Sequence, residues 1–264
     1  MLFLSLNAGC NNVDATASKS KEYSPLIIAH RGASELEPEH TLRSYSRAIK
    51  DGTDFIEIDL RVTKDGKLVA FHDEDVSRTT DGKGDIEDLS LNHVKELRTE
   101  KDQQVLTLEE IIKKYGDSTK YYIETREDSK GRLVMEKKLI DILNRYNLLE
   151  NNQVIIQSFS AKSLKKVRKL NKEVPIVQLV QTWDAGKLSE RIKDYKKYAY
   201  AIGISSQTLS DKEVNMIHDE NMDVHTFFRV ELEKEETKRM IELKVDGMFT
   251  NNPAYLNKLL DESK

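Results

Sequence analysis

The sequence contains a single cysteine, four prolines and eleven glycines among its 264 residues, and no long apolar run. One cysteine excludes a disulfide framework and any zinc site built on several thiolates. So little proline and glycine argues against a fibrous or disordered chain. No apolar stretch approaches the roughly 20 residues needed to span a bilayer. These absences leave a compact globular domain.

An excess of charge of one sign is also missing, because 42 basic and 46 acidic side chains give a formal net charge of −4. The polybasic footprint of a nucleic-acid-binding protein is therefore absent, and we expect no nucleic-acid partner. The motifs GxxxxGK, GxGxxG, HExxH, GxSxG and CxxC do not occur either. Nucleotide-binding, zinc-protease and serine-hydrolase functions thus lack their anchor residues.

From Pro25 onward, short β-type runs alternate with helical patterns. The runs are LIIAH (26–30), DFIEIDL (54–60), LVAFH (68–72), YYIET (121–125), QVIIQSF (153–159), PIVQLV (175–180), AIGIS (201–205), DVHTF (223–227) and DGMFT (246–250). Asp65-Gly66 predicts a hairpin, so the third run is an antiparallel excursion from the second. The remaining runs predict a (β/α)₈ barrel, an α/β fold of about 250 residues. An open doubly wound sheet is the alternative.

The helical stretches between these runs have recognisable ends. Thr107 and Glu110 form a capping box ahead of an apolar face, and Gly116 follows that face as a stop signal. Another helix is expected from Glu39 to a stop at Gly52.

The regular alternation of β-type runs and helical stretches predicts the domain organisation. Residues 73–106, rich in Asp, Gly and Thr, interrupt it and predict a small insertion subdomain over one end of the barrel. We expect residues 25–264 to form one barrel domain carrying that insertion, preceded by a separate segment over residues 1–24.

The N-terminal MLFLSLNAGC ends in small residues and the only cysteine. It resembles the tail of a bacterial lipoprotein signal with Cys10 as the lipidated residue. It lacks a preceding basic residue, and its apolar part is shorter than the roughly 7–15 residues of a signal core. The following NNVDATASKSKEYS is typical of a polar tether. We favour an extracytoplasmic bacterial protein anchored through Cys10, or secreted, over an incidental cysteine in a polar terminus.

Polar residues at strand ends are the candidates for function, because barrel sites form at the C-terminal ends of strands. Glu57 and Asp59 are two residues apart on one strand, so both face the same side, and Glu124 ends the next barrel strand. Inward carboxylates this close repel each other unless a cation compensates. Three carboxylates without cysteine suit Mg²⁺ or Ca²⁺ rather than zinc. The alternative is pairing with arginines: Arg31, Arg61 or Arg126.

Histidines also fall at the strand ends. An unperturbed histidine titrates near neutral pH, so we expect His30 and His72 to act as general acid and general base. Arg31 follows His30 directly, and its guanidinium group suits a phosphoryl group. His40 and His225 could line the mouth of the barrel, but we expect catalysis from neither.

These residues lie in motifs that resemble the glycerophosphodiester phosphodiesterase family. The matching segments, in order, are HRG (30–32), PE-x-T (38–41), GTDFIEIDLRVTKDGKLVAFHD (52–73), RTTDGKGDI (78–86), LTLEE (106–110), YYIET (121–125), QSF (157–159) and DGMFTNNP (246–253). The resemblance spans roughly residues 26–260, and the first segments alone are highly specific.

The resemblance implies a (β/α)₈ barrel with a small insertion, a divalent metal, and hydrolysis of glycerophosphodiesters to sn-glycerol 3-phosphate and an alcohol. Matched by position, the implied roles are an acid–base pair of His30 and His72, a phosphate contact from Arg31, and metal ligands Glu57, Asp59 and Glu124. Arg126 stands where many members have lysine, which keeps a cation near the phosphate. The nucleophile is either water or the glycerol 2-hydroxyl of the substrate.

Two departures from the family pattern concern the mouth of the site and the branch. His40 replaces the asparagine of the usual PENT, so the mouth differs or a structural hydrogen bond is replaced. VHTFFRV (224–230) and YYIET are similar to the secreted branch. Phe159, Phe227 and Trp183 are candidates for an apolar wall at the mouth, with ordinary packing as the alternative for each. Lysophospholipids, glycerol-phosphate polymers, or binding without hydrolysis remain the alternatives to small glycerophosphodiesters.

Overall fold

The computed structural model describes residues 23–263, and its main sheet closes into a barrel of eight parallel strands. In ring order these are β1 (Leu26–Ala29), β2 (Phe55–Val62), β6 (Lys120–Glu124), β7 (Val154–Ser158), β8 (Ile176–Val180), β9 (Ala201–Ser205), β10 (Asp223–Phe227) and β11 (Gly247–Thr250). Strand β1 pairs in parallel with both β11 and β2, which closes the ring. The predicted (β/α)₈ barrel is confirmed, and the open sheet is wrong.

The hairpin after β2 also forms as predicted. Strand β3 (Leu68–Ala70) runs antiparallel to β2, with Ala70 opposite Leu60. Gly66 in the turn has a φ of +79°, a left-handed conformation that glycine adopts without strain. The third apolar run therefore pairs with the last residues of β2, Leu60–Val62, and is not a strand of the barrel.

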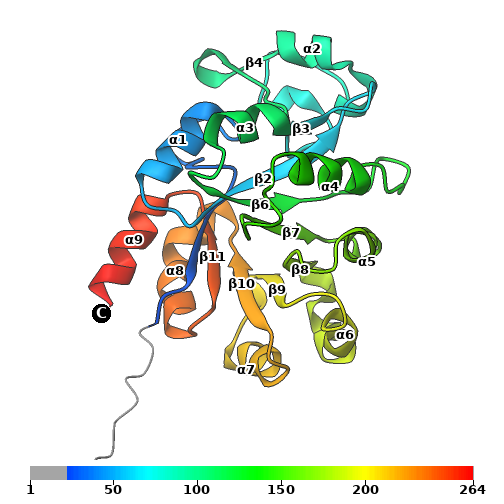
Figure 1. The fold of residues 1–264 in the computed structure, drawn as a ribbon. Coiled ribbons are helices and arrows are strands. Elements are labelled where there is room, and N and C mark those ends of the chain that lie inside the picture. The colour runs from blue at the N-terminus through cyan, green and yellow to red at the C-terminus, as the bar shows by residue number, and fades with distance from the viewer. Residues whose placement is uncertain (1–22, 264) are drawn as a thin grey trace, which may run out of the picture.

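Helices cover the outside of the barrel (Figure 1). They are α1 (Leu42–Lys50), α3 (Leu108–Tyr115), α4 (Glu136–Arg145), α5 (Ala161–Leu170), α6 (Leu188–Tyr195), α7 (Asp211–Asp219), α8 (Glu233–Glu242) and α9 (Pro253–Glu262), whereas α2 (Leu91–Glu96) lies in the insertion. The capping box at Thr107 and Glu110 starts α3 as predicted. Helix α1 starts later than predicted, because His40 has a left-handed φ of +57° and Thr41 is the N-cap.

Alternation along each strand separates two apolar layers. In β2, Phe55 faces the barrel interior, whereas Ile56 and Ile58 pack against the outer helices. The interior cluster consists of Ile28, Phe55, Tyr122, Ile155, Val177, Ala201 and Phe249. These side chains fill the barrel, so the functional side chains lie above a packed floor.

Residues 73–106 leave the barrel beyond the hairpin and form a small unit of their own. They contain α2, the two-residue strands β4 (Arg98–Thr99) and β5 (Gln103–Gln104), and short 3₁₀ turns, at the top of Figure 1. Their apolar cluster, shared with Val69 and Phe71, is Val76, Ile86, Val94, Leu97 and Val105. This core is separate from the barrel interior.

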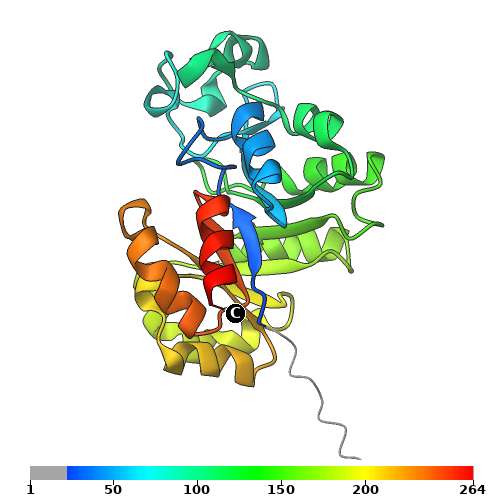
Figure 2. The same ribbon diagram turned by 90° about the vertical axis from the view of Figure 1, so that its left-hand side faces the viewer.

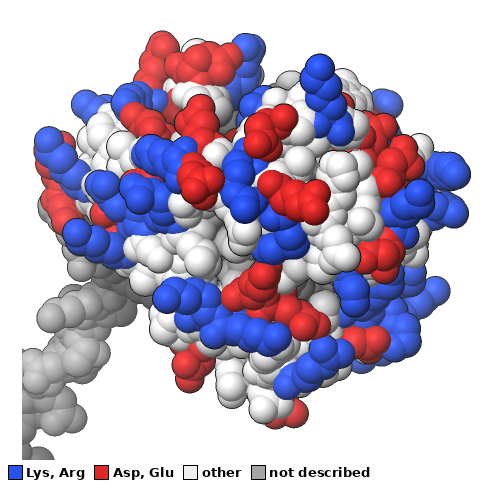
Figure 3. Space-filling view, turned by 90° about the horizontal axis from the view of Figure 1, so that it is seen from above, with Lys and Arg blue, Asp and Glu red and all other residues white. Residues whose placement is uncertain are grey.

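The two ends of the described chain meet beside the closing seam of the barrel. Helix α9 lies along β1 in Figure 2. Seen from the end that carries the insertion, positive and negative side chains alternate without a large region of one sign (Figure 3). Within residues 23–263, no helix is both long and apolar enough to cross a membrane. The predicted Cys10 anchor and most of the 1–24 segment lie outside the described residues.

Candidate active site

A cavity of about 220 Å³ opens at the C-terminal end of the barrel. Its lining includes the residues that the sequence assigned to catalysis, phosphate and metal, together with two of the three expected wall residues: His30, Arg31, Glu57, Asp59, His72, Glu124, Arg126, Phe159 and Phe227. Gln157, Leu179, Phe228 and Phe249 complete the wall. The barrel therefore brings these side chains from six different strands or strand ends into one place.

The carboxylates of the cavity contact arginines. Asp59 lies 2.7 Å from Arg126 Nη2 and 3.3 Å from Arg31 Nε, and Glu124 lies 2.9 Å from Arg126 Nε. Glu57 accepts a hydrogen bond from the backbone N–H of Arg31 at 2.8 Å. The arginine pairing considered above is thus present for Asp59 and Glu124.

Arg61 does not take part in that pairing. Its guanidinium group donates to the backbone carbonyl of His72 at 3.0 and 3.1 Å and lies 3.5 Å from Glu74. Of the three arginines considered from the sequence, Arg61 therefore supports the loop that carries His72.

Burial affects the three carboxylates differently. It raises the pKa of Glu57 well above its usual value, and the neighbouring Asp59 and Glu124 add to the shift. Burial also raises the pKa of Glu124, to about 7, although Arg126 opposes it. For Asp59, burial is outweighed by Arg126 and a hydrogen bond from His40, which hold its pKa well below the usual range.

The donor set fits a divalent cation. Three buried carboxylates face two guanidinium groups, so one negative charge lacks a partner, and hard cations prefer such oxygen ligands. Ligand atoms of His40, Glu57 and Asp59 lie within 4.8 Å of one another. Glu124, the third predicted ligand, is not in that group, and its Oε1 lies 2.9 Å from Arg126 Nε.

His30 directly follows β1, and its ring is held by residues of β11, the strand that pairs with β1, and of the loop after β11. Its Nδ1 lies 2.9 Å from Asn251 Oδ1, and its ring meets the edge of Phe249 at a centroid distance of 6.4 Å. Burial and the adjacent Arg31 lower the pKa of His30 to about 3. The imidazole is therefore neutral at neutral pH.

His72 is held by a carboxylate instead. Its Nδ1 lies 2.6 Å from Asp73 Oδ1, and Asp73 in turn contacts Arg78. Burial lowers the pKa of His72, while Asp59 and the hydrogen bond to Asp73 oppose this shift. The two histidines thus face one cavity in different electrostatic settings.

Two further polar residues belong to the site: the sequence analysis placed His40 only at the mouth of the barrel and gave Gln157 no role. His40 is buried, with Nε2 3.0 Å from Asp59 and Nδ1 2.8 Å from the Tyr45 hydroxyl. Gln157 lies on β7 with Nε2 3.5 Å from Glu57, and its buried Oε1 has no hydrogen-bond partner within residues 23–263. The available signals were the histidine inside the PE-x-T motif and a glutamine in an otherwise apolar strand.

The other mouth residues fall in different places. Phe159 and Phe227 meet edge to face at a centroid distance of 6.1 Å and form an apolar wall. Trp183 is 77% exposed and does not line the cavity. His225 is buried below the mouth, where its Nδ1 lies 2.7 Å from the Tyr122 hydroxyl.

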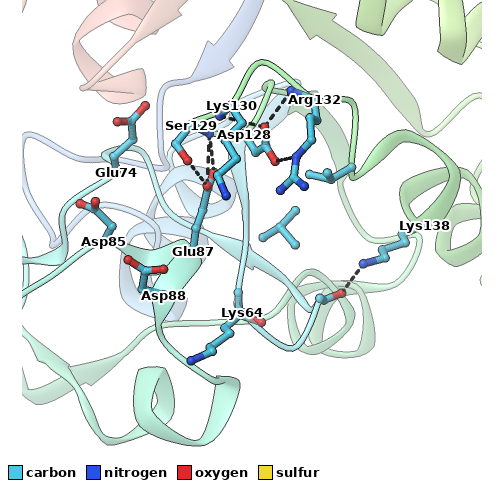
Figure 4. A pocket seen from close by; sticks show the side chains of 14 residues that line it. Lys64, Glu74, Asp85, Glu87, Asp88, Asp128, Ser129, Lys130, Arg132 and Lys138 are labelled. Carbon is cyan, nitrogen blue, oxygen red and sulfur yellow. Dashed lines mark hydrogen bonds and ion pairs between the residues drawn. The ribbon is translucent and has the colours of Figure 1, made fainter.

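A second cavity, of about 350 Å³, lies outside the barrel between the insertion and the loop after β6 (Figure 4). It is rich in acidic side chains, but its buried carboxylate, Asp128, already binds Arg132 and nearby backbone N–H groups. Glu87 accepts hydrogen bonds from Ser129 and ties the insertion to that loop. None of the predicted catalytic or metal residues lines this cavity.

Comparisons with known proteins agree with this geometry. The model of the glycerophosphoryl diester phosphodiesterase family matches residues 30–255. A Bacillus subtilis protein named glycerophosphodiester phosphodiesterase is 37% identical over 268 residues, covering 93% of this chain and 90% of the relative. A Caldanaerobacter subterraneus protein of the same name is 34% identical over 250 residues, covering 89% and 97%. A crystal structure from Galdieria sulphuraria has a TM-score of 0.79 at 26% identity, covering 92% of this chain and 100% of that one.

Proposed function

The chain belongs to the glycerophosphoryl diester phosphodiesterase family, and we propose that this enzyme hydrolyses glycerophosphodiesters to sn-glycerol 3-phosphate and an alcohol. The observation that carries the proposal is the single cavity in which two histidines, two arginines and three carboxylates converge. Phosphodiester hydrolysis needs positive charge on the phosphate oxygens and proton transfer at the attacking and leaving oxygens. The cavity supplies residue types for each need.

Positive charge on the phosphate comes first from the arginines. Arg31 and Arg126 reach into the cavity from the ends of β1 and β6, and their guanidinium groups suit phosphate oxygens. Both are pre-positioned by Asp59, which lies between them.

Glu57, Asp59 and Glu124 are the proposed ligands for one Mg²⁺ or Ca²⁺ ion, with His40 beside them. When bound, such a cation would neutralise phosphate oxygens and the excess carboxylate charge. The raised pKa of Glu57 supports this role, because a buried carboxylate without a partner cation favours its protonated form.

His30 and His72 are the proposed acid–base pair. One histidine takes the proton from the attacking hydroxyl, either water or the glycerol 2-hydroxyl, and the other protonates the leaving alkoxide. Attack by the 2-hydroxyl would leave a cyclic phosphate, which a water molecule would then open to glycerol 3-phosphate. Both rings use Nδ1 for a protein contact, to Asn251 and to Asp73. The Nε2 atoms are the ones left for the substrate.

The size of the cavity favours a small substrate. At about 220 Å³ it suits a glycerol phosphate with a compact head group beside Phe159 and Phe227. A lysophospholipid or a glycerol-phosphate polymer would have to extend outside it. Small head-group diesters are therefore our first choice.

The reaction is tested with purified protein and glycerophosphocholine, with EDTA or with added Ca²⁺ or Mg²⁺, by measuring glycerol 3-phosphate. We expect metal-dependent release that falls by at least about 10²-fold in His72→Ala, since a general acid or base contributes that much. His93→Ala, an exposed histidine on α2, is the matched control and keeps full activity. Folded protein that releases nothing with any metal would contradict the proposal, and lysophospholipids and polymers would be tried next.

We further propose that the enzyme acts outside the cytoplasmic membrane, attached through a lipidated Cys10. The support is the apolar MLFLSLNAGC followed by a polar stretch. Such an anchor would hold the barrel near the membrane surface without a spanning helix.

A further inference from the structure

A chain of hydrogen bonds connects helix α8 with the His30 ring. Glu233 is the first residue of α8 and is only 4% exposed. Its carboxylate accepts from Thr250 Oγ1 at 2.5 Å, from the Asn251 backbone N–H at 3.0 Å and from Asn251 Nδ2 at 2.5 Å. Asn251 Oδ1 then lies 2.9 Å from His30 Nδ1.

Hydrogen-bond donors surround the Glu233 carboxylate. Burial raises its pKa, but the hydrogen bonds from Thr250 and Asn251 oppose the shift. The N-terminus of α8 also favours a negative charge at this position. The backbone N–H of Asn251 can only donate, so one carboxylate oxygen must accept.

The orientation of the Asn251 amide follows from that acceptor. A carboxylate cannot donate a hydrogen bond, so the NH₂ group of Asn251 must face Glu233 and Oδ1 must face the other way. Ser34 Oγ lies 2.7 Å from this Oδ1 and 2.8 Å from the His30 carbonyl oxygen, so its single proton is shared by two acceptors and the amide orientation rests on Glu233. His30 Nδ1 meets an oxygen that only accepts, so Nδ1 must carry the proton.

We propose that Glu233 is a positioning residue that, through Asn251, holds neutral His30 in the tautomer with the proton on Nδ1. Nε2 then carries a lone pair and can accept a proton from a hydroxyl in the cavity. Glu233 itself does not line the cavity and touches no reacting atom. The inference rests on the proposed function for its catalytic consequence, but the tautomer itself does not depend on the substrate.

The tautomer is measured directly in protein labelled with ¹⁵N-histidine. At neutral pH we expect His30 Nδ1 to show a directly bonded proton and Nε2 to show the shift of an unprotonated ring nitrogen. The His30 signals are identified by their loss in His30→Asn. A wild-type spectrum with the proton on Nε2 overturns the proposal, whatever the variants do.

Glu233→Gln tests the relay. The glutamine oxygen must still accept from the Asn251 N–H, so its NH₂ group would face Asn251 Nδ2. Two NH₂ groups repel, so Asn251 turns over and offers NH₂ to His30. We expect His30 to switch its proton to Nε2 and kcat to fall at least about 10²-fold with little change in KM, as when a buried acid behind a catalytic histidine becomes an amide.

Two further variants separate this effect from a loss of fold. Glu233→Asp keeps the carboxylate, so we expect it to keep the Nδ1 proton and to recover most of kcat. Glu235→Gln removes an exposed carboxylate from the same turn of α8 and should leave both the spectrum and kcat unchanged. Unchanged His30 signals or unchanged kcat in Glu233→Gln would overturn the proposal.

The experiment also distinguishes this inference from the function on which it rests. If the wild type releases no glycerol 3-phosphate, the proposed function fails, while the ¹⁵N spectra still decide the tautomer. If the wild type is active but Glu233→Gln matches it, only the positioning role fails.

Discussion

His40, which stands where the family resemblance gives asparagine, contacts a carboxylate of the site. Its Nε2 lies 3.0 Å from Asp59, and the Tyr45 hydroxyl lies 2.8 Å from Nδ1. If His40 Nε2–H donates to the Asp59 carboxylate, the Tyr45 hydroxyl donates to His40 Nδ1. Both ring nitrogens of the buried histidine then have a hydrogen-bond partner. Of the two interpretations left by the sequence, replacement of a structural hydrogen bond is the one that this geometry fits.

His225 leads to a prediction about pH. Burial lowers its pKa to about 4, whereas an unfolded histidine titrates near about 6.5. Between these values the unfolded chain binds more protons, so the free energy of unfolding decreases as pH falls, by up to about 3 kcal/mol from this residue. His225→Asn should therefore flatten the acid side of the stability profile measured by urea unfolding.

The control for this profile is His93→Asn, because His93 is exposed on α2. It should follow the wild type at every pH. If His225→Asn also parallels the wild type between about pH 6.5 and 4, a buried neutral histidine is not responsible for the slope.

At the scale of elements, the insertion is joined to the active site through Arg78. Its guanidinium group binds both oxygens of Glu39, at 2.7 and 3.0 Å, and also contacts Asp73. Glu39 lies 3.3 Å from Arg31, and Asp73 holds His72. One side chain of the insertion thus supports residues on both sides of the cavity.

Replacing Arg78 should affect activity more than stability. We expect Arg78→Met to lower kcat/KM about 10-fold, because His72 and Arg31 lose their shared support and small displacements are costly in catalysis. Exposed ion pairs contribute about 1 kcal/mol or less, so the melting temperature should change little. Arg78→Lys should be intermediate, since an ammonium group cannot hold two carboxylates in a fork.

Lys83→Met provides the comparison, since Lys83 is exposed in the same insertion. It should keep the kcat/KM of the wild type. Equal kcat/KM in Arg78→Met and Lys83→Met would show that the insertion does not support the site through Arg78.

At the scale of the whole molecule, closure of the barrel puts together residues from the two ends of the chain. His30 and Asn251 are 221 positions apart and 2.9 Å from each other. The contact exists because β1 pairs with β11 at the seam. A site distributed over the ring in this way depends on the complete barrel and not on one segment.

The position of the molecule in the cell provides the last prediction. If Cys10 carries lipid, expression in a bacterial host fed with labelled palmitate should label the wild type and leave it in the membrane fraction. Cys10→Ser should be unlabelled and released. Labelling of neither protein, with both in the same fraction, would contradict the anchor.

Much of the fold was predictable because strand and hairpin signals are local. Alternating apolar residues, Asp65-Gly66 and the Thr107 capping box determine their own segments. The start of α1 was missed because His40 is held from outside its own segment: its backbone N–H donates to the Arg31 carbonyl at 3.0 Å, and its ring lies 3.0 Å from Asp59 on β2.

For the site, the sequence by itself determined which residue types stand at the strand ends, and so the choice of His30, His72, Glu57, Asp59 and Glu124. Only the tertiary structure decided how they are partnered. Arg126 rather than Arg61 meets the carboxylates, and Glu233 reaches His30 through Asn251. Strand periodicity fixes which way a side chain faces, but its partners come from other strands, and their distances exist only once the ring has closed.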